Sequence, residues 1–158
     1  MRFVLIGVAG ANYYARSAAS LFTTQDRDLF LPPDVTNTLA AWAACGALDL
    51  ALESAGEPLG EPLDRELAER VVQRRASVRA TDGRGLVVDL TYVMTGFDFE
   101  SVERERRTFR VAGVEVPVAS LGHIVRSKQA TGRDKDRLFL ASHADAIRDL
   151  LREDEGRE

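Results

Sequence analysis

The chain has 158 residues, of which 45% are hydrophobic and 29% charged, and its formal net charge is −4. This length and composition suit one globular domain with a buried core, and no apolar run reaches the ~18 residues of a membrane span. The negative net charge argues against broad binding to DNA, which normally requires a basic surface.

The N-terminal half predicts strands that alternate with helices. A strand at Arg2–Ile6 leads through the turn Gly7-Val8-Ala9-Gly10 into an alanine-rich helix that extends to about Ala19. The elements expected next are a strand at Gln25–Leu31, a helix from Val35 to Cys45 with Asp34 as its N-cap, a loop at Gly56–Pro62 and a helix at Leu63–Arg74. The chain enters a core strand almost at once, so either the fold needs no helix before this strand or the chain begins after one.

The C-terminal half predicts two hairpins followed by helices. The hairpins pair Ser77–Ala80 with Leu86–Val93 and Thr108–Val111 with Val114–Val118, and the helices run from Ser120 to Ala130 and from Arg133 to Arg152, before a frayed tail at Glu153–Glu158. Strand–helix units together with hairpins predict an α/β fold, a mixed sheet flanked by helices, in a single domain over residues 1–158. The only cysteine, Cys45, is expected to be buried and excludes an intrachain disulfide, which favours the cytoplasm.

Three aspartates are candidate ligands of a divalent metal ion. Asp26 and Asp28 are two residues apart on a predicted strand, so their side chains point to one face with Cα atoms roughly 6.5–7 Å apart. Asp89 lies inside an apolar strand, where a buried carboxylate is costly unless it is paired with a positive charge or bound to a metal ion. Oxygen ligands of this kind suit Mg²⁺ or Mn²⁺. For Asp26 and Asp28, the alternative is a pair of solvent-facing acids near a strand end, which protect the edge of a sheet. For Asp89, the alternative is a salt bridge to an arginine.

Two further features suit an anion such as phosphate. Gly7 and Gly10 lie between a strand and a helix, where exposed N–H groups can approach a phosphate, although most such turns are purely structural. The only two lysines, Lys128 and Lys135, lie seven positions apart, with Arg133 between them. This basic segment suits a small polyanion or a nucleic acid, and a solvated helix face is the alternative.

These segments together resemble the minimal nucleotidyltransferases, including the nucleotidyltransferase-like toxins of bacterial toxin–antitoxin and abortive-infection systems. The resemblance rests on Val4-Leu5-Ile6-Gly7-Val8, Thr24-Gln25-Asp26-Arg27-Asp28-Leu29, Val87-Val88-Asp89-Leu90 and the segment from Ser120 to Asp136. It implies a nucleotidyltransferase-type sheet with a C-terminal helix pair, two Mg²⁺ ions, an NTP donor and transfer of a nucleoside monophosphate to a protein or RNA acceptor. It also implies catalytic and metal-binding roles for Asp26, Asp28 and Asp89, and NTP contacts from Gly7, Val8, Lys128, Arg133 and Lys135.

Val8 departs from the pattern of this family, which has glycine or serine there. Valine has no hydroxyl that could donate a hydrogen bond to a triphosphate, and its branched side chain crowds a turn. A nucleotidyltransferase fold that has lost activity and serves as a binding or regulatory partner, for example of a cognate antitoxin, is therefore the alternative function.

Overall fold

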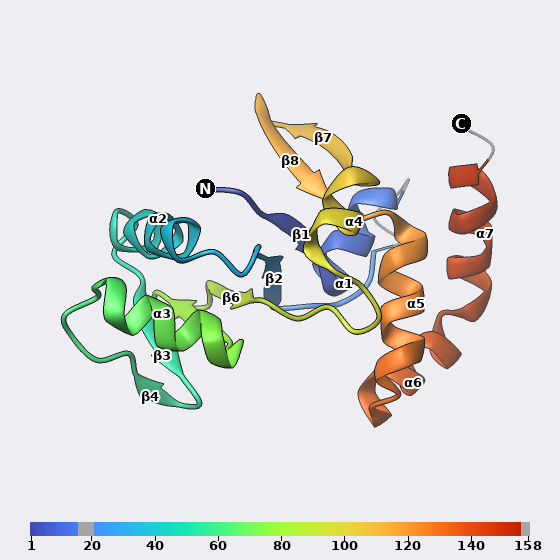
Figure 1. Ribbon diagram of the computed structural model, residues 1–158. Coiled ribbons are helices and arrows are strands. Elements are labelled where there is room, and N and C mark those ends of the chain that lie inside the picture. The colour runs from blue at the N-terminus through green and yellow to red at the C-terminus, as the bar shows by residue number, and fades with distance from the viewer. Residues whose placement is uncertain (16–20, 156–158) are drawn as a thin grey trace.

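The computed structural model describes residues 1–15 and 21–155, and in this part of the chain eight strands form one mixed sheet (Figure 1). The strands are β1 (Val4–Ile6), β2 (Asp26–Phe30), β3 (Ala51–Ser54), β4 (Glu57–Pro58), β5 (Val78–Thr81), β6 (Val87–Thr91), β7 (Arg107–Val111) and β8 (Val114–Val118). From edge to edge they lie in the order β4-β3-β5-β6-β2-β1-β8-β7. The pairs β2·β6 and β1·β8 are parallel and the other pairs are antiparallel, so the expected mixed α/β class is confirmed.

Helices lie on both sides of this sheet. They are α1 (Gly7–Ala11), the 3₁₀ turn η1 (Asn12–Tyr14), α2 (Val35–Gly46), α3 (Arg65–Arg74), α4 (Phe99–Arg104), α5 (Leu121–Thr131), α6 (Asp134–Ser142) and α7 (Ala144–Glu155). In Figure 1, α2 and α3 lie on the left, and α5, α6 and α7 lie on the right. Within the described residues, no helix combines the length and the apolar character that crossing a membrane requires.

The two faces of the sheet carry different side chains, because successive residues of a strand point in opposite directions. Val4, Ile6 and Phe30 belong to an apolar cluster with α1, α4, α5 and α7. Leu29 and Leu90 belong to a second cluster, with α2 and α3. Asp28 pairs with Ile6 across β1 and β2 and therefore shares the face of the first cluster. On that face the helices cover β1, and the polar side chains of β2, β6 and β5 line a cavity beside them.

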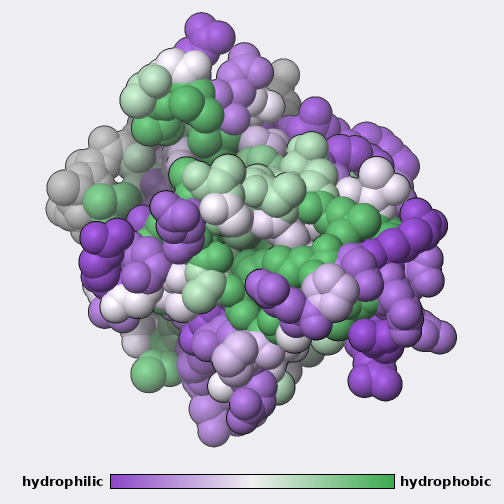
Figure 2. Space-filling model, turned by 90° about the vertical axis from the view of Figure 1, so that its left-hand side faces the viewer, coloured by the Kyte–Doolittle hydropathy of each residue, from purple (hydrophilic) through white to green (hydrophobic). Residues whose placement is uncertain are grey.

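The opposite side of the molecule is formed by α2 and α3. Helix α2 has no charged residue, and its N-cap Asp34 accepts a hydrogen bond from the backbone N–H of Asn37, as the sequence predicts. Figure 2, which views this side, shows apolar surface in the middle and hydrophilic surface around it.

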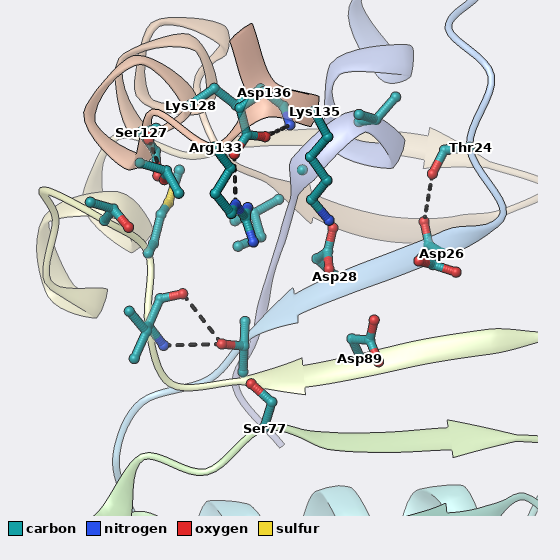
Figure 3. A pocket seen from close by; sticks show the side chains of 18 of the residues that line it. Thr24, Asp26, Asp28, Ser77, Asp89, Ser127, Lys128, Arg133, Lys135 and Asp136 are labelled. Atoms are coloured by element: carbon teal, nitrogen blue, oxygen red, sulfur yellow. Dashed lines mark hydrogen bonds and ion pairs between the residues drawn. The ribbon is translucent and has the colours of Figure 1, made fainter. Parts of the chain in front are cut away.

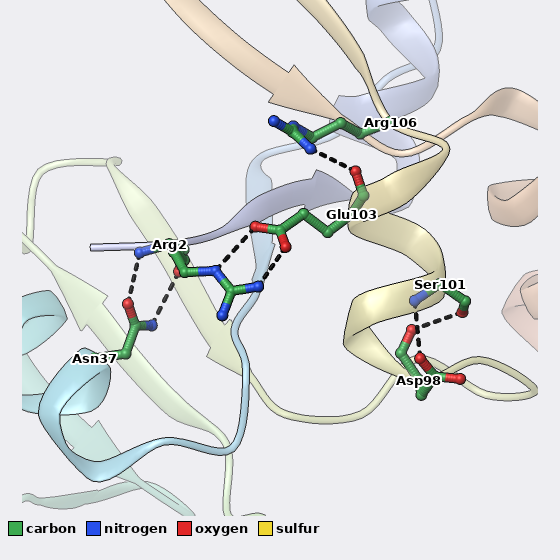
Figure 4. A network of polar contacts seen from close by, with 6 residues as sticks. All are labelled: Arg2, Asn37, Asp98, Ser101, Glu103 and Arg106. Carbon is green, nitrogen blue, oxygen red and sulfur yellow. Dashed lines mark hydrogen bonds and ion pairs between the residues drawn. The ribbon is translucent and has the colours of Figure 1, made fainter.

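A polar network ties the first strand to two helices (Figure 4). The Asn37 side chain of α2 accepts from the backbone N–H of Arg2 at 2.5 Å and donates to its carbonyl at 2.9 Å. The Arg2 guanidinium pairs with Glu103 of α4. Asp98 caps α4 through the backbone N–H of Ser101. The contacts of Arg2 thus join the residue that precedes β1 by two positions to α2 and α4.

Several predicted elements differ from the structure. The long final helix is wrong: it is divided into α6 and α7 at His143, whose ring packs against Phe22 and Phe139. The tail is helical to Glu155 rather than frayed, and its last three residues lie outside the described part. The first helix ends at Ala11, and the predicted continuation over 16–19 is likewise outside the described residues. The predicted loop at 56–62 contains β4, and β3 and α4 were not expected.

Candidate active site

The turn between β1 and α1 brings the backbone close to a carboxylate of β2. Gly7 has φ +66°, a left-handed conformation that favours glycine. A Cβ atom at this position would lie 2.1 Å from Oδ2 of Asp28. Only a residue without a side chain therefore allows the turn to approach Asp28 so closely.

Adjacent strands place the three predicted aspartates on one face of the sheet. Strands β2 and β6 run parallel with Asp28 opposite Asp89, and Asp26 precedes Asp28 by two residues. All three side chains line one cavity of about 800 Å³ (Figure 3). The cavity is also lined by the other residues expected to contact a nucleotide, which are Gly7, Val8, Lys128, Arg133 and Lys135.

The carboxylates of this cavity repel one another. Burial, and then the charges of Asp89 and Asp26, raise the pKa of Asp28. Lys128 and Lys135 act in the opposite direction. The cluster is therefore stabilised by positive charge, whether from a side chain or from a bound cation.

Arg79 of β5 supplies part of that positive charge. Its Nε donates to Oδ1 of Asp89 at 2.8 Å and its Nη2 donates to Oδ2 at 2.9 Å, a bidentate pair that raises the pKa of Arg79. The same Nη2 lies 3.9 Å from Oδ2 of Asp26. The salt bridge that the sequence offered as the alternative partner of Asp89 is thus present.

On the other side of the cavity, Asp136 holds two of the predicted cations. It is 1% exposed and accepts from Nζ of Lys128 at 3.0 Å and from Nε of Arg133 at 2.8 Å. Burial opposes ionisation of Asp136, but these hydrogen bonds outweigh it and its pKa is lowered. The order along the chain explains the contact, because Lys128 lies near the end of α5 and Asp136 lies in the first turn of α6.

Lys135 is placed differently from these two cations. Figure 3 shows its side chain extending toward Asp28, and its charge partly offsets the burial and the neighbouring carboxylates that raise the pKa of that residue. Within residues 1–15 and 21–155, Lys135 forms no ion pair. It is the predicted cation with the most direct access to a ligand beside the aspartates.

The donor atoms suit a hard divalent cation. Asp26, Asp28 and Asp89 offer carboxylate oxygens, which Mg²⁺ and Mn²⁺ prefer, and all three side chains line the cavity. In the described part of the chain, no group of three His, Cys, Asp or Glu side chains is already arranged as a metal site. Both oxygens of Asp89 are engaged by Arg79 instead.

Arg79, Glu53 and Ser77, which were not predicted from the sequence, also line the cavity. Arg79 lies in the strand of the predicted hairpin that pairs with the strand of Asp89. The register of that hairpin places these two residues opposite each other. This register was the signal that could have identified Arg79. Glu53 lies on β3, a strand that was not predicted, so no comparable signal pointed to it.

A comparison of the chain with protein-family models found no match, and a comparison with curated proteins found none either. The assignment of a function therefore depends on the geometry and chemistry of this cavity.

Proposed function

We propose that this protein is a metal-dependent nucleotidyltransferase that moves a nucleoside monophosphate from an NTP to a hydroxyl of a protein or RNA acceptor. The observation that carries the proposal is the arrangement of one cavity. Three aspartates on two adjacent strands face Lys128, Arg133 and Lys135 from the helix pair α5–α6. A metal-bound triphosphate carries both kinds of charge and would bridge these two groups.

The chemistry assigned to these residues is phosphoryl-group substitution. The acceptor hydroxyl oxygen forms a bond to the α-phosphorus, the bond from that phosphorus to the oxygen bridging to the β-phosphate breaks, and pyrophosphate leaves. One aspartate of the cluster takes the hydroxyl proton. Asp26, Asp28 and Asp89 would hold Mg²⁺ or Mn²⁺, which would supply positive charge to the phosphate oxygens. Lys135 and Lys128 stabilise the negative charge on the leaving pyrophosphate.

The resemblance to bacterial nucleotidyltransferase toxins adds a partner to this proposal. We infer a cytoplasmic component of a toxin–antitoxin pair, with a cognate antitoxin as binding partner. The second candidate function is an inactive nucleotidyltransferase fold with a regulatory role. Val8 favours it, because its half-buried side chain lines the cavity and packs on the core without offering a hydroxyl to the triphosphate.

Labelled nucleotides distinguish these functions. The purified protein is incubated with cell extract, Mg²⁺ and each NTP labelled at the α- or the γ-phosphate. Nucleotidyl transfer predicts that the α-label enters protein or RNA, that the γ-label does not, and that EDTA and Asp28→Asn abolish the labelling. Asp145→Asn is the matched control, because Asp145 is an exposed residue of α7 that pairs with Arg148. Mg²⁺-dependent NTP binding without any labelling supports the regulatory role.

A further inference from the structure

Four charged residues form a row across neighbouring strands on the cavity face of the sheet. Glu53 of β3 pairs with Arg79 of β5, Arg79 pairs with Asp89 of β6, and Asp89 pairs with Asp28 of β2. Directly opposed residues on adjacent strands point to the same face, with Cβ atoms about 4.5–5.5 Å apart. Arg79 therefore stands between two acidic neighbours, Asp89 on one side and Glu53 on the other.

In the structure Arg79 is committed to one of these neighbours. Its two hydrogen bonds occupy both oxygens of Asp89, and its Nη2 also approaches Asp26. Glu53 forms no ion pair in the described part of the chain, although its charge acts on Arg79. The guanidinium thus lies where it neutralises two of the three carboxylates proposed to hold a metal ion.

A divalent cation and Arg79 compete for the same oxygens. A cation that binds Asp89 on the face of the carboxylate now used by Arg79 requires the guanidinium to leave. The side chain of Arg79 is 44% exposed, so water can solvate it while it moves. Its stem is fixed on β5, and Glu53 is the acidic residue directly opposite it on the other side.

We propose that Arg79 is a latch with two positions: it binds Asp89 when the site holds no metal, and a divalent cation displaces it toward Glu53. This inference rests on the proposed metal site. Before the cation binds, the guanidinium of Arg79 neutralises part of the negative charge of the aspartates. Because the cation has to displace Arg79, this residue also sets the cation concentration at which the metal site is filled. It also moves one positive charge from the aspartates to the wall of the cavity formed by β3 and β5 when the cation binds.

The latch is tested by the binding of Mn²⁺ to the full chain without nucleotide, measured from the electron paramagnetic resonance signal of free Mn²⁺. Arg79→Gln removes the competitor, so Mn²⁺ should bind at least about fivefold more tightly than to the wild type, equivalent to about 1 kcal/mol. Glu53→Gln removes the second position of the latch and should weaken binding. Arg84→Gln is the matched control, because it removes the same charge from the 87% exposed Arg84 in the β5–β6 turn and should leave binding nearly unchanged.

A second measurement follows the latch in the metal-free protein. Urea unfolding of Arg79→Gln, Asp89→Asn and the double variant gives the interaction free energy between the two side chains. This interaction energy should be present in EDTA and lost at saturating Mg²⁺, because the cation displaces Arg79 from Asp89. Equal Mn²⁺ affinities of Arg79→Gln and Arg84→Gln, with binding that Asp28→Asn abolishes, would overturn the latch and leave the metal site intact. Absence of Mn²⁺ binding in both the wild type and Arg79→Gln would overturn the metal site itself.

Discussion

Gly7 determines how closely the first turn of the chain approaches Asp28. Its positive φ and the 2.1 Å distance from a hypothetical Cβ to Oδ2 of Asp28 are two separate reasons for glycine at this position. Gly83, in the β5–β6 turn, has nearly the same conformation, φ +69°, but a Cβ there would meet no atom within 4 Å. Substituting each glycine in turn therefore separates the free-energy cost of the backbone conformation, which both share, from the cost of displacing the Asp28 carboxylate, which only Gly7 has.

We expect Gly7→Ala to lower the free energy of unfolding by about 1–3 kcal/mol and to abolish Mg²⁺ stabilisation, because the methyl group forces Asp28 to move. Gly83→Ala has only the backbone cost and should keep the Mg²⁺ effect. Urea unfolding with and without Mg²⁺ measures both quantities. Equal losses in the two variants, with the Mg²⁺ effect retained in Gly7→Ala, would show that the turn does not position Asp28.

Asp136 is a buried carboxylate whose charge is held by Lys128 and Arg133. Because its folded pKa is below the ordinary value of an aspartate, its contribution to stability is present above that ordinary value and is lost as the pH falls through the lowered pKa. We expect Asp136→Asn to cost about 1.5–3 kcal/mol at pH 7, the usual value of hydrogen bonds to a charged group. The variant should also lose less stability than the wild type between about pH 5 and pH 3.

Asp134→Asn is the control for this pH series, since Asp134 lies in the same helical turn, is 93% exposed and pairs with Arg137. It should follow the wild-type pH dependence closely in urea unfolding. Parallel curves for the wild type and Asp136→Asn would mean that Asp136 is not ionised in the folded protein.

At the scale of elements, the helix pair α5–α6 forms the basic wall of the cavity. The Asp136 contacts join the end of α5 to the start of α6, across Gly132 with φ +62°. Lys128 and Arg133 consequently have a structural role in addition to any contact with a ligand. Substituting either residue therefore changes the stability of the helix pair and the binding of a ligand at the same time. Lys135 of α6 has no such contact and is the cleaner probe of nucleotide binding.

We expect Lys135→Ala to weaken the binding of a Mg²⁺–NTP analogue by about fivefold, or about 1 kcal/mol, without changing the melting temperature. Arg137→Ala removes the same charge from the same helix, but Arg137 pairs with Asp134 and does not line the cavity. It should bind the analogue as the wild type does. Calorimetric titration compares the two, and equal affinities would remove Lys135 from the site.

The elements that the sequence predicts well are those with strong local patterns. Asp34 and Ser120 mark helix starts that the structure has at α2 and α5, and the two predicted hairpins are β5–β6 and β7–β8. Strands β3 and β4 were missed because they are short and contain glutamate, serine and proline, which are not typical of strands. The prediction of one long helix was wrong because the chain turns at His143, whose ring packs against Phe22, a residue distant in the sequence.

The candidate site shows the same difference between features that local patterns predict and features that depend on contacts between segments. The spacing of Asp26 and Asp28 correctly predicts a shared face, because that follows from the strand alone. The pairing of Asp89 with Arg79, and that of Lys128 with Asp136, depend on the hairpin register and on the angle between α5 and α6. The register could have been inferred from the predicted hairpin, whereas the angle between α5 and α6 is not encoded in a local pattern.

At the scale of the whole molecule, the cavity exists because the helices cover the two faces of the sheet unequally. Helices α2 and α3 pack on the face of Leu29 and Leu90, whereas α1 and α5 pack beside β1 on the other face. The polar residues of β2, β6, β5 and β3 thus meet the basic end of α5–α6 across open space. We propose that this space binds a metal-complexed nucleoside triphosphate.

The most direct test is calorimetric titration of the wild-type protein with an NTP whose α–β bridging oxygen is replaced by a methylene group, in Mg²⁺ and in EDTA. We expect binding in Mg²⁺, at least about tenfold weaker binding in EDTA, and the same loss in Asp28→Asn but not in Asp145→Asn. Binding of equal strength with and without Mg²⁺, or unchanged binding in Asp28→Asn, would show that the cavity is not a metal-dependent nucleotide site.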